Sequence, residues 1–148
     1  MRFVPDLMTK SFEETERKLD AILTAARLSP RTVYYLAIVD RADGAYIGEI
    51  GYHVSLRTEL GCRADLGYFI RKQYWNRGIV TEAARAVVAD AFEERDVWKM
   101  TAGCLAENVA SERVLSKVGF TKEAALRRHQ FHEGVWKDRV EYGLVRVS

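Results

Sequence analysis

The residues best suited to binding a charged ligand lie in one short turn, residues 71–78, which is followed directly by a helix-forming stretch. Arg77 supplies a permanent cation, and Gly78 lets a ligand approach the backbone closely. Apolar residues follow at the helical period, at positions 80, 83, 84, 87, 88 and 91, and predict a helix over 79–92 with one buried face. The first turn of that helix directs unpaired N–H groups and the positive end of its dipole toward Gly78. This arrangement predicts a phosphate or pyrophosphate site.

The segments before this turn predict one helix and three strands. Ser11 and Glu14 form a capping box, so a helix is expected from there to about Leu28, where Ser29-Pro30 ends it. Alternating or β-branched residues predict strands over 32–39, 46–54 and 65–70, the first two joined by a hairpin turn at 40–44. Residues 57–63 are polar and are expected to form a loop. Residues 1–9, with Pro5 among them, are expected to be irregular.

The segments after the helix complete one domain over residues 1–148. Strands are expected over 99–105, 120–130 and 136–145, with a turn at 132–134 joining the last two. A short helix is expected over 110–118, ended by Gly119 in the place of a C-terminal glycine cap. The order of these elements predicts an α/β (α+β) fold with a mostly antiparallel central sheet and helices on both faces.

Composition excludes several classes of protein. Hydrophobic residues make up 48% of the 148 residues, charged residues 30%, and the net charge is +2, a profile typical of a soluble domain that does not bind nucleic acid. The two cysteines and three histidines lack the spacing of a metal site or a disulfide framework. No apolar run is long enough to cross a membrane and no signal-peptide core opens the chain, so a cytoplasmic protein is expected.

Three segments carry a family resemblance. Residues 74–83, Tyr-Trp-Asn-Arg-Gly-Ile-Val-Thr-Glu-Ala, resemble the acetyl-CoA loop of the GNAT N-acetyltransferases, and most of all its ribosomal-protein N-terminal acetyltransferase branch. Asn76 stands where that branch usually has glycine, and Val80 where it has alanine or glycine. Residues 106–120 are similar to the family's Glu-Asn-x-x-Ser-x-x-x-Leu-x-Lys-x-Gly-Phe segment, and residues 134–142 to its closing Gly-x-Trp-x-Asp…Tyr. The three segments follow one another in the family's order.

The resemblance implies acetyl-CoA as cosubstrate and a set of residues that bind it. The end of the central strand is expected to pair its backbone with the pantetheine arm, and the turn to hold the pyrophosphate. The implied cofactor-binding residues are Phe69, Ile70, Arg71, Asn76, Arg77, Gly78, Ile79, Val80, Thr81 and Asn108. Asn108 has a second role open to it, because it also stands where it would cap the following helix.

The resemblance also implies where the chemistry takes place. Asp65 stands where several relatives carry a catalytic carboxylate, usually a glutamate, and would act as a base through a water molecule; otherwise it pairs with Arg63 or Arg57. Ser116 is expected to donate a hydrogen bond to the departing thiolate, or else to be an ordinary helical serine. Three residues are expected to line the acceptor site or, alternatively, to belong to the core: Tyr52, His129 and Trp136.

The function expected is acetyl transfer to a primary amine by direct reaction in a ternary complex. The acceptor is left open among a protein N-terminus, an amino acid, a polyamine and an aminoglycoside, and the alternative is a catalytically silent acyl-CoA-binding module. The family usually has a strand and a helix, about thirty residues, before the stretch that resembles residues 1–5. Without them the strand at 32–39 is expected to be an edge and to favour a homodimer.

Overall fold

A computed structural model describes residues 10–147 and shows one mixed sheet of six strands. The strand order is β1-β2-β3-β4-β6-β5, and every neighbouring pair is antiparallel except β3 and β4, which are parallel. The predicted mixed fold with a mostly antiparallel sheet is therefore confirmed. The elements are α1 (Phe12–Ala26), β1 (Val33–Val39), β2 (Tyr46–Thr58), β3 (Gly61–Ile70), the 3-10 turn η2 (Lys72–Tyr74), α2 (Ile79–Glu94), β4 (Val97–Leu105), α3 (Val109–Val118), β5 (Thr121–His132) and β6 (Val135–Val145).

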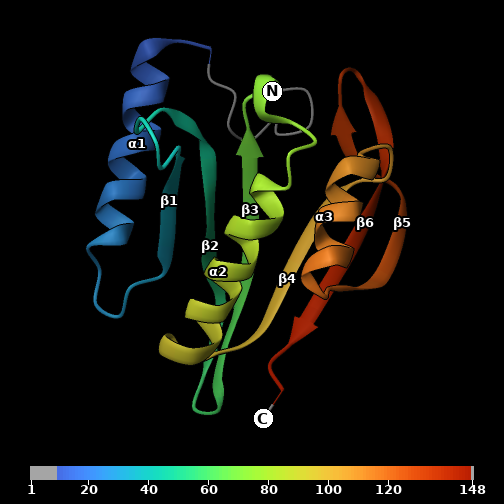
Figure 1. The fold of residues 1–148 in the computed structure, drawn as a ribbon. Coiled ribbons are helices and arrows are strands. Elements are labelled where there is room, and N and C mark those ends of the chain that lie inside the picture. Colours follow the sequence, from blue (N-terminus) through green and yellow to red (C-terminus); the bar gives the residue numbers. More distant parts are fainter. Residues whose placement is uncertain (1–9, 148) are drawn as a thin grey trace.

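Helices α2 and α3 lie side by side over one face of the sheet, and the core fills the space beneath them (Figure 1). Ala84 and Ala91 on α2 and Met100 on β4 have no exposed surface. Small alanine side chains let α2 approach the sheet closely, and the alternation of each strand sends every second side chain into this core. The other residues of β2, β3 and β4 therefore point to the opposite face, which α2 and α3 do not cover.

Helix α1 lies along β1 at one edge of the sheet (Figure 1). Its predicted cap is confirmed, because the Ser11 hydroxyl accepts a hydrogen bond of 3.1 Å from the Glu14 N–H. None of its residues is buried, and Phe12 is 77% exposed. Within residues 10–147 no helix combines the length and the apolar character needed to span a membrane. Residues 1–9, expected to be irregular, lie outside the described part of the chain.

Residues 57–63 form a hairpin and not the polar loop that was predicted. Strand β2 continues to Thr58 and β3 begins at Gly61. The Thr58 hydroxyl donates to the Gly61 carbonyl at 2.7 Å and accepts from the Leu60 N–H at 3.2 Å, while Gly61 has a φ of 122° that favours glycine. The residues are polar because this end of the hairpin is largely exposed, so a polar composition does not distinguish it from a loop.

Candidate functional site

The sheet opens between its two central strands. β3 and β4 pair in parallel from Cys62 and Val97 as far as Asp65 and Thr101, and no further. Both strands continue, β3 to Ile70 and β4 to Leu105, but no longer pair with each other. Backbone N–H and C=O groups along these diverging edges need other partners. The opening therefore suits an extended ligand that pairs with main-chain groups.

The turn after β3 brings the start of α2 beside this opening. Asn76 and Gly78 both have positive φ, 58° and 74°, which asparagine tolerates and glycine adopts freely. Gly78 caps α2 with no side-chain hydrogen bond, and a Cβ placed there would meet nothing within 4 Å. The first N–H groups of α2 are therefore left for a ligand, as the sequence predicts. Val80, which departs from the family pattern, points into the core and is 8% exposed.

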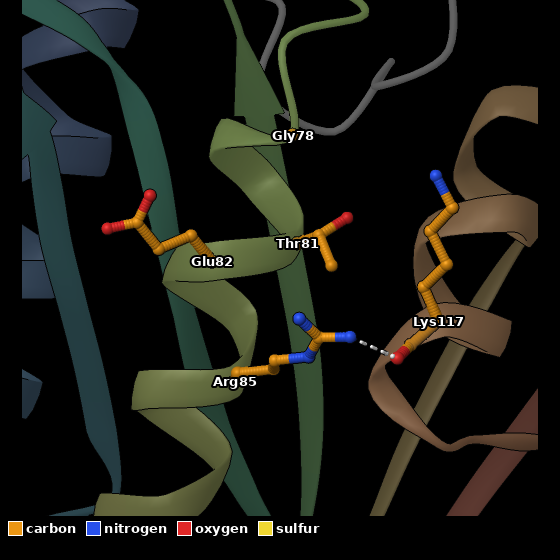
Figure 2. A pocket seen from close by; sticks show the side chains of 5 residues that line it. All are labelled: Gly78, Thr81, Glu82, Arg85 and Lys117. Carbon is orange, nitrogen blue, oxygen red and sulfur yellow. Dashed lines mark hydrogen bonds between the residues drawn. The ribbon is translucent and has the colours of Figure 1, made fainter.

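A hollow of about 520 Å³ lies between the start of α2 and the end of α3, lined by Gly78, Thr81, Glu82, Arg85 and Lys117. Figure 2 shows Thr81 and Lys117 on opposite sides of it, with Glu82 turned away from Lys117. Arg85 reaches toward α3 and donates to the Lys117 carbonyl at 2.9 Å. Two cations beside a free helix N-terminus favour a phosphate. Arg85 and Lys117 were missed as site residues, although Arg85 follows Thr81 by one helical turn and shares its face.

Several predicted cofactor residues already have partners. The Arg71 N–H donates to the Ile47 carbonyl at 3.0 Å, and the Ile70 carbonyl accepts from the Trp75 indole at 3.0 Å. These two groups stabilise the turn and are not free to bind a ligand arm. Arg77 stays close to the turn, with its guanidinium 5.6 Å from the centre of the Tyr74 ring.

The other side of the opening is formed by α3. Asn108 caps this helix by accepting from the Ser111 N–H at 3.2 Å, which confirms its alternative role and leaves its NH₂ group for a ligand. The Tyr68 and Ser111 hydroxyls lie 2.8 Å apart and connect the far end of β3 to α3. Burial raises the pKa of Tyr68 well above its ordinary value, so this phenol stays protonated. Sequence reasoning missed both residues, because the contact spans 43 positions.

Asp65 lies at the point where β3 and β4 separate, on the face opposite α2. One of its carboxylate oxygens accepts a hydrogen bond from the Thr101 hydroxyl, and the other lies 3.1 Å from Nε2 of His53. The alternative partners predicted for Asp65 are engaged elsewhere, since Arg63 donates to the Ser55 hydroxyl at 3.2 Å and Arg57 to the Arg31 carbonyl at 3.3 Å. Asp65 is thus part of a polar group at the sheet opening.

Ser116 lies on the helix side of the sheet, away from Asp65. It contacts the Tyr142 hydroxyl, which also donates to Glu112 at 2.5 Å. Lys117, one residue on, lines the hollow beside α2, so Ser116 lies on a different side of α3. Burial and Glu112 raise the pKa of Tyr142, while Ser116 lowers it.

The three predicted acceptor residues are not brought together. Tyr52 is 2% exposed and stacks on Tyr34, with the two ring centres 4.7 Å apart. It therefore belongs to the core, which was the alternative expected for it, and not to the wall of an acceptor site. Trp136 is 61% exposed at the β5–β6 hairpin, edge-on to Phe131. His129 is exposed on β5, the outermost strand on that side of the described sheet.

Comparisons with known proteins agree with this geometry. The family profile described as Acetyltransferase (GNAT) domain matches residues 1–121. The chain is 38% identical over 112 residues to the probable N-acetyltransferase YjcK of Bacillus subtilis (strain 168), covering 76% of this chain and 61% of YjcK. It is 30% identical over 138 residues to the uncharacterized N-acetyltransferase YoaA of the same strain, covering 93% of this chain and 77% of YoaA.

Among solved structures, the chain is similar to RimL, a ribosomal L7/L12 alpha-N-protein acetyltransferase in complex with coenzyme A. The TM-score is 0.84 at 18% identity, over 97% of this chain and 78% of RimL. At that identity the likeness concerns the fold. The chain spans less than two thirds of YjcK, so the match describes a shared domain and not the whole of that relative.

Proposed function

The chain belongs to the acetyltransferase (GNAT) family, and on that premise we propose that it transfers the acetyl group of acetyl-CoA to a primary amine. The observation that carries the proposal is that β3 and β4 diverge directly beside an uncapped helix start. One extended ligand with phosphates at one end and a thioester at the other suits both features.

The residues present fit the phosphate end of acetyl-CoA. The N–H groups that open α2 and the open space over Gly78 accept a pyrophosphate without displacing a side chain. Arg85 and Lys117 add two positive charges across the hollow. The diverging edge of β3 past Asp65 offers main-chain N–H groups to the arm. One such N–H can also polarise the thioester oxygen.

The state of the cysteines supports direct transfer to the amine, without an acyl-enzyme. Burial raises the pKa of the Cys104 thiol, which makes it a poor nucleophile, and Cys62 is 1% exposed. The amine itself therefore attacks the thioester in a ternary complex. Asp65, at the sheet opening, is the carboxylate expected to take part in proton removal from the amine. Ser116 stays a candidate hydrogen-bond donor to the thiolate. Its hydroxyl contacts Tyr142, so it would have to reach the sulfur from that side of α3.

The test is acetyl-CoA consumption against a panel of amines: short peptides with free N-termini, amino acids, polyamines and aminoglycosides. Release of the free thiol is followed with a thiol reagent. We expect turnover with at least one class, and a fall of about 10²-fold in kcat/KM for Asp65→Asn.

Thermal unfolding with and without acetyl-CoA runs beside this assay, and Arg77→Glu is expected to remove most of the shift. Binding without turnover for any amine would instead support the catalytically silent acyl-CoA-binding module. Absence of both turnover and a thermal shift at millimolar acetyl-CoA would reject both functions.

A further inference from the structure

Three polar side chains form a row across three neighbouring strands at the sheet opening. His53 on β2 lies directly opposite Asp65 on β3, and Asp65 lies directly opposite Thr101 on β4. The row thus lies at the last position where β3 and β4 still pair. It faces away from the core that α2 covers, on a side where the His53 side chain is 52% exposed. Solvent or an acceptor can reach the imidazole directly.

The contacts within the row occupy both oxygens of Asp65. The Thr101 hydroxyl donates to Oδ1, and His53 Nε2 lies 3.1 Å from Oδ2. Neither carboxylate oxygen is therefore left without a partner to take the proton of an amine. His53 is different, because within residues 10–147 no hydrogen bond is made to its other ring nitrogen, Nδ1. The group in this row that is open to accept a proton is therefore the imidazole.

We propose that His53 is the base that removes the proton from the acceptor amine, with Asp65 as a positioning residue that fixes the ring and Thr101 as a positioning residue that fixes Asp65. This inference rests on the proposed function, and it gives to His53 the proton that Asp65 was expected to accept. An imidazole changes charge near neutral pH, whereas amines are largely protonated there. The arrangement is that of a base oriented by a carboxylate.

The acceptor loses two protons in this step. The ammonium form of the acceptor gives one proton to Nδ1 of His53, and the neutral amine attacks the thioester carbon. The C–N bond forms, the C–S bond breaks, and the second amine proton leaves with the sulfur as the thiol. The imidazolium then returns its proton to solvent. The Asp65 carboxylate stabilises the imidazolium through its contact with Nε2.

The other basic side chains near Asp65 do not form an ion pair with it. Arg63 on β3 donates to the Ser55 hydroxyl, and Lys99 on β4 contacts Glu123 at 2.8 Å. His53 is thus the one positively chargeable group in the described residues that forms an ion pair with Asp65. If Asp65 only stabilised the sheet, its partner would not have to be an exposed imidazole at the sheet opening.

The experiment compares His53→Ala with the wild-type chain, using the best acceptor from the amine panel. We expect kcat/KM to fall about 10²-fold, with the thermal shift caused by acetyl-CoA unchanged. Free imidazole added to His53→Ala should restore part of kcat, because the site is open to solvent. Thr101→Val should lower kcat several-fold and Thr101→Ser should restore it. Glu59→Ala, an exposed change in the turn that follows the same strand, is the matched control and should behave as wild type.

Two results overturn the proposal. One is kcat/KM for His53→Ala within twofold of wild type. The other is a loss that imidazole does not restore, because it would show that His53 supports the fold or the acceptor and does not carry the proton. A wild-type chain that binds acetyl-CoA and acetylates no amine would instead reject the proposed function, and with it the role of His53.

Discussion

Lys117 offers the clearest test of how the phosphate end of acetyl-CoA is held. Its ammonium group lines the hollow beside α2, and no contact with another side chain of residues 10–147 occupies it. Arg85, in contrast, also holds the Lys117 carbonyl, so changing Arg85 would disturb α3 as well. Lys117→Gln therefore removes a charge from the site with little effect on the fold. Its remaining cost is the loss of a favourable cation in the last turn of α3, below about 1 kcal/mol.

The expected loss of affinity follows from one charge-assisted contact. Such a hydrogen bond contributes about 1.5–3 kcal/mol, and the lower end applies because Lys117 is exposed. A loss of about 1.4 kcal/mol weakens binding roughly tenfold. At a ligand concentration that gives the wild type about 2.7 kcal/mol of stabilisation, Lys117→Gln should retain about 1.4 kcal/mol. For a chain of this length the melting-temperature shift should then shrink by roughly 3–5 °C.

Thermal unfolding with a titration of acetyl-CoA measures this difference, and calorimetry gives Kd independently. Lys117→Arg should keep most of the shift because it keeps the charge. Lys18→Gln, on the exposed helix α1, controls for the change in net charge. An equal shift in the wild type and in Lys117→Gln would refute the placement of a phosphate in this hollow.

Three further predictions concern the fold and its assembly. Met100→Ala should lower the free energy of unfolding by about 2–5 kcal/mol in a urea titration, since Met100 is 0% exposed in the core; a loss below about 1 kcal/mol would contradict the packing. Hydrogen bonds from Lys122 and Tyr142 lower the pKa of Glu112, so its stabilisation is present above the unfolded value of about 4.3 and is lost as pH falls through the lower folded value. Urea midpoints between pH 3 and 7 should therefore fall less steeply for Glu112→Gln, and identical slopes would argue against these bonds. Within the described residues β1 pairs only with β2, so we expect self-association at high micromolar concentration that Ala37→Lys weakens; a monomer in light scattering for both chains would reject this contact.

The turn and helix that hold the phosphate site could be predicted from the sequence because their signals are local. Gly78, expected to let a ligand approach the backbone, adopts a positive φ at the start of α2, and α2 buries five of the six positions expected from the helical period. Gly119 ends α3 in the left-handed conformation, and its N–H donates to the Leu115 carbonyl at 3.2 Å. Each of these features depends on residues within one or two turns of each other.

The polar row could not be predicted, because it depends on strand register. Counting back from the hairpin pairs Thr58 and Gly61 would place His53 opposite Leu66. An irregularity between Val54 and Leu56 shifts the register by one residue and brings His53 opposite Asp65 instead. A shift of one position turns every side chain to the other face, so the composition of either strand alone carries no sign of the contact.

The short parallel pairing of β3 and β4 has a consequence for the rigidity of the whole sheet. Four residue pairs join these strands, against ten between β2 and β3 and seven between β4 and β6. The described sheet is thus two antiparallel ribbons, β1-β2-β3 and β4-β6-β5, joined along a narrow seam and by α2. A pantetheine arm lying along the open part of this seam would form hydrogen bonds with main-chain groups of both ribbons. Amide hydrogen exchange should then slow along the diverging ends of β3 and β4 when acetyl-CoA binds, far from any phosphate contact, as two ribbons come to move as one.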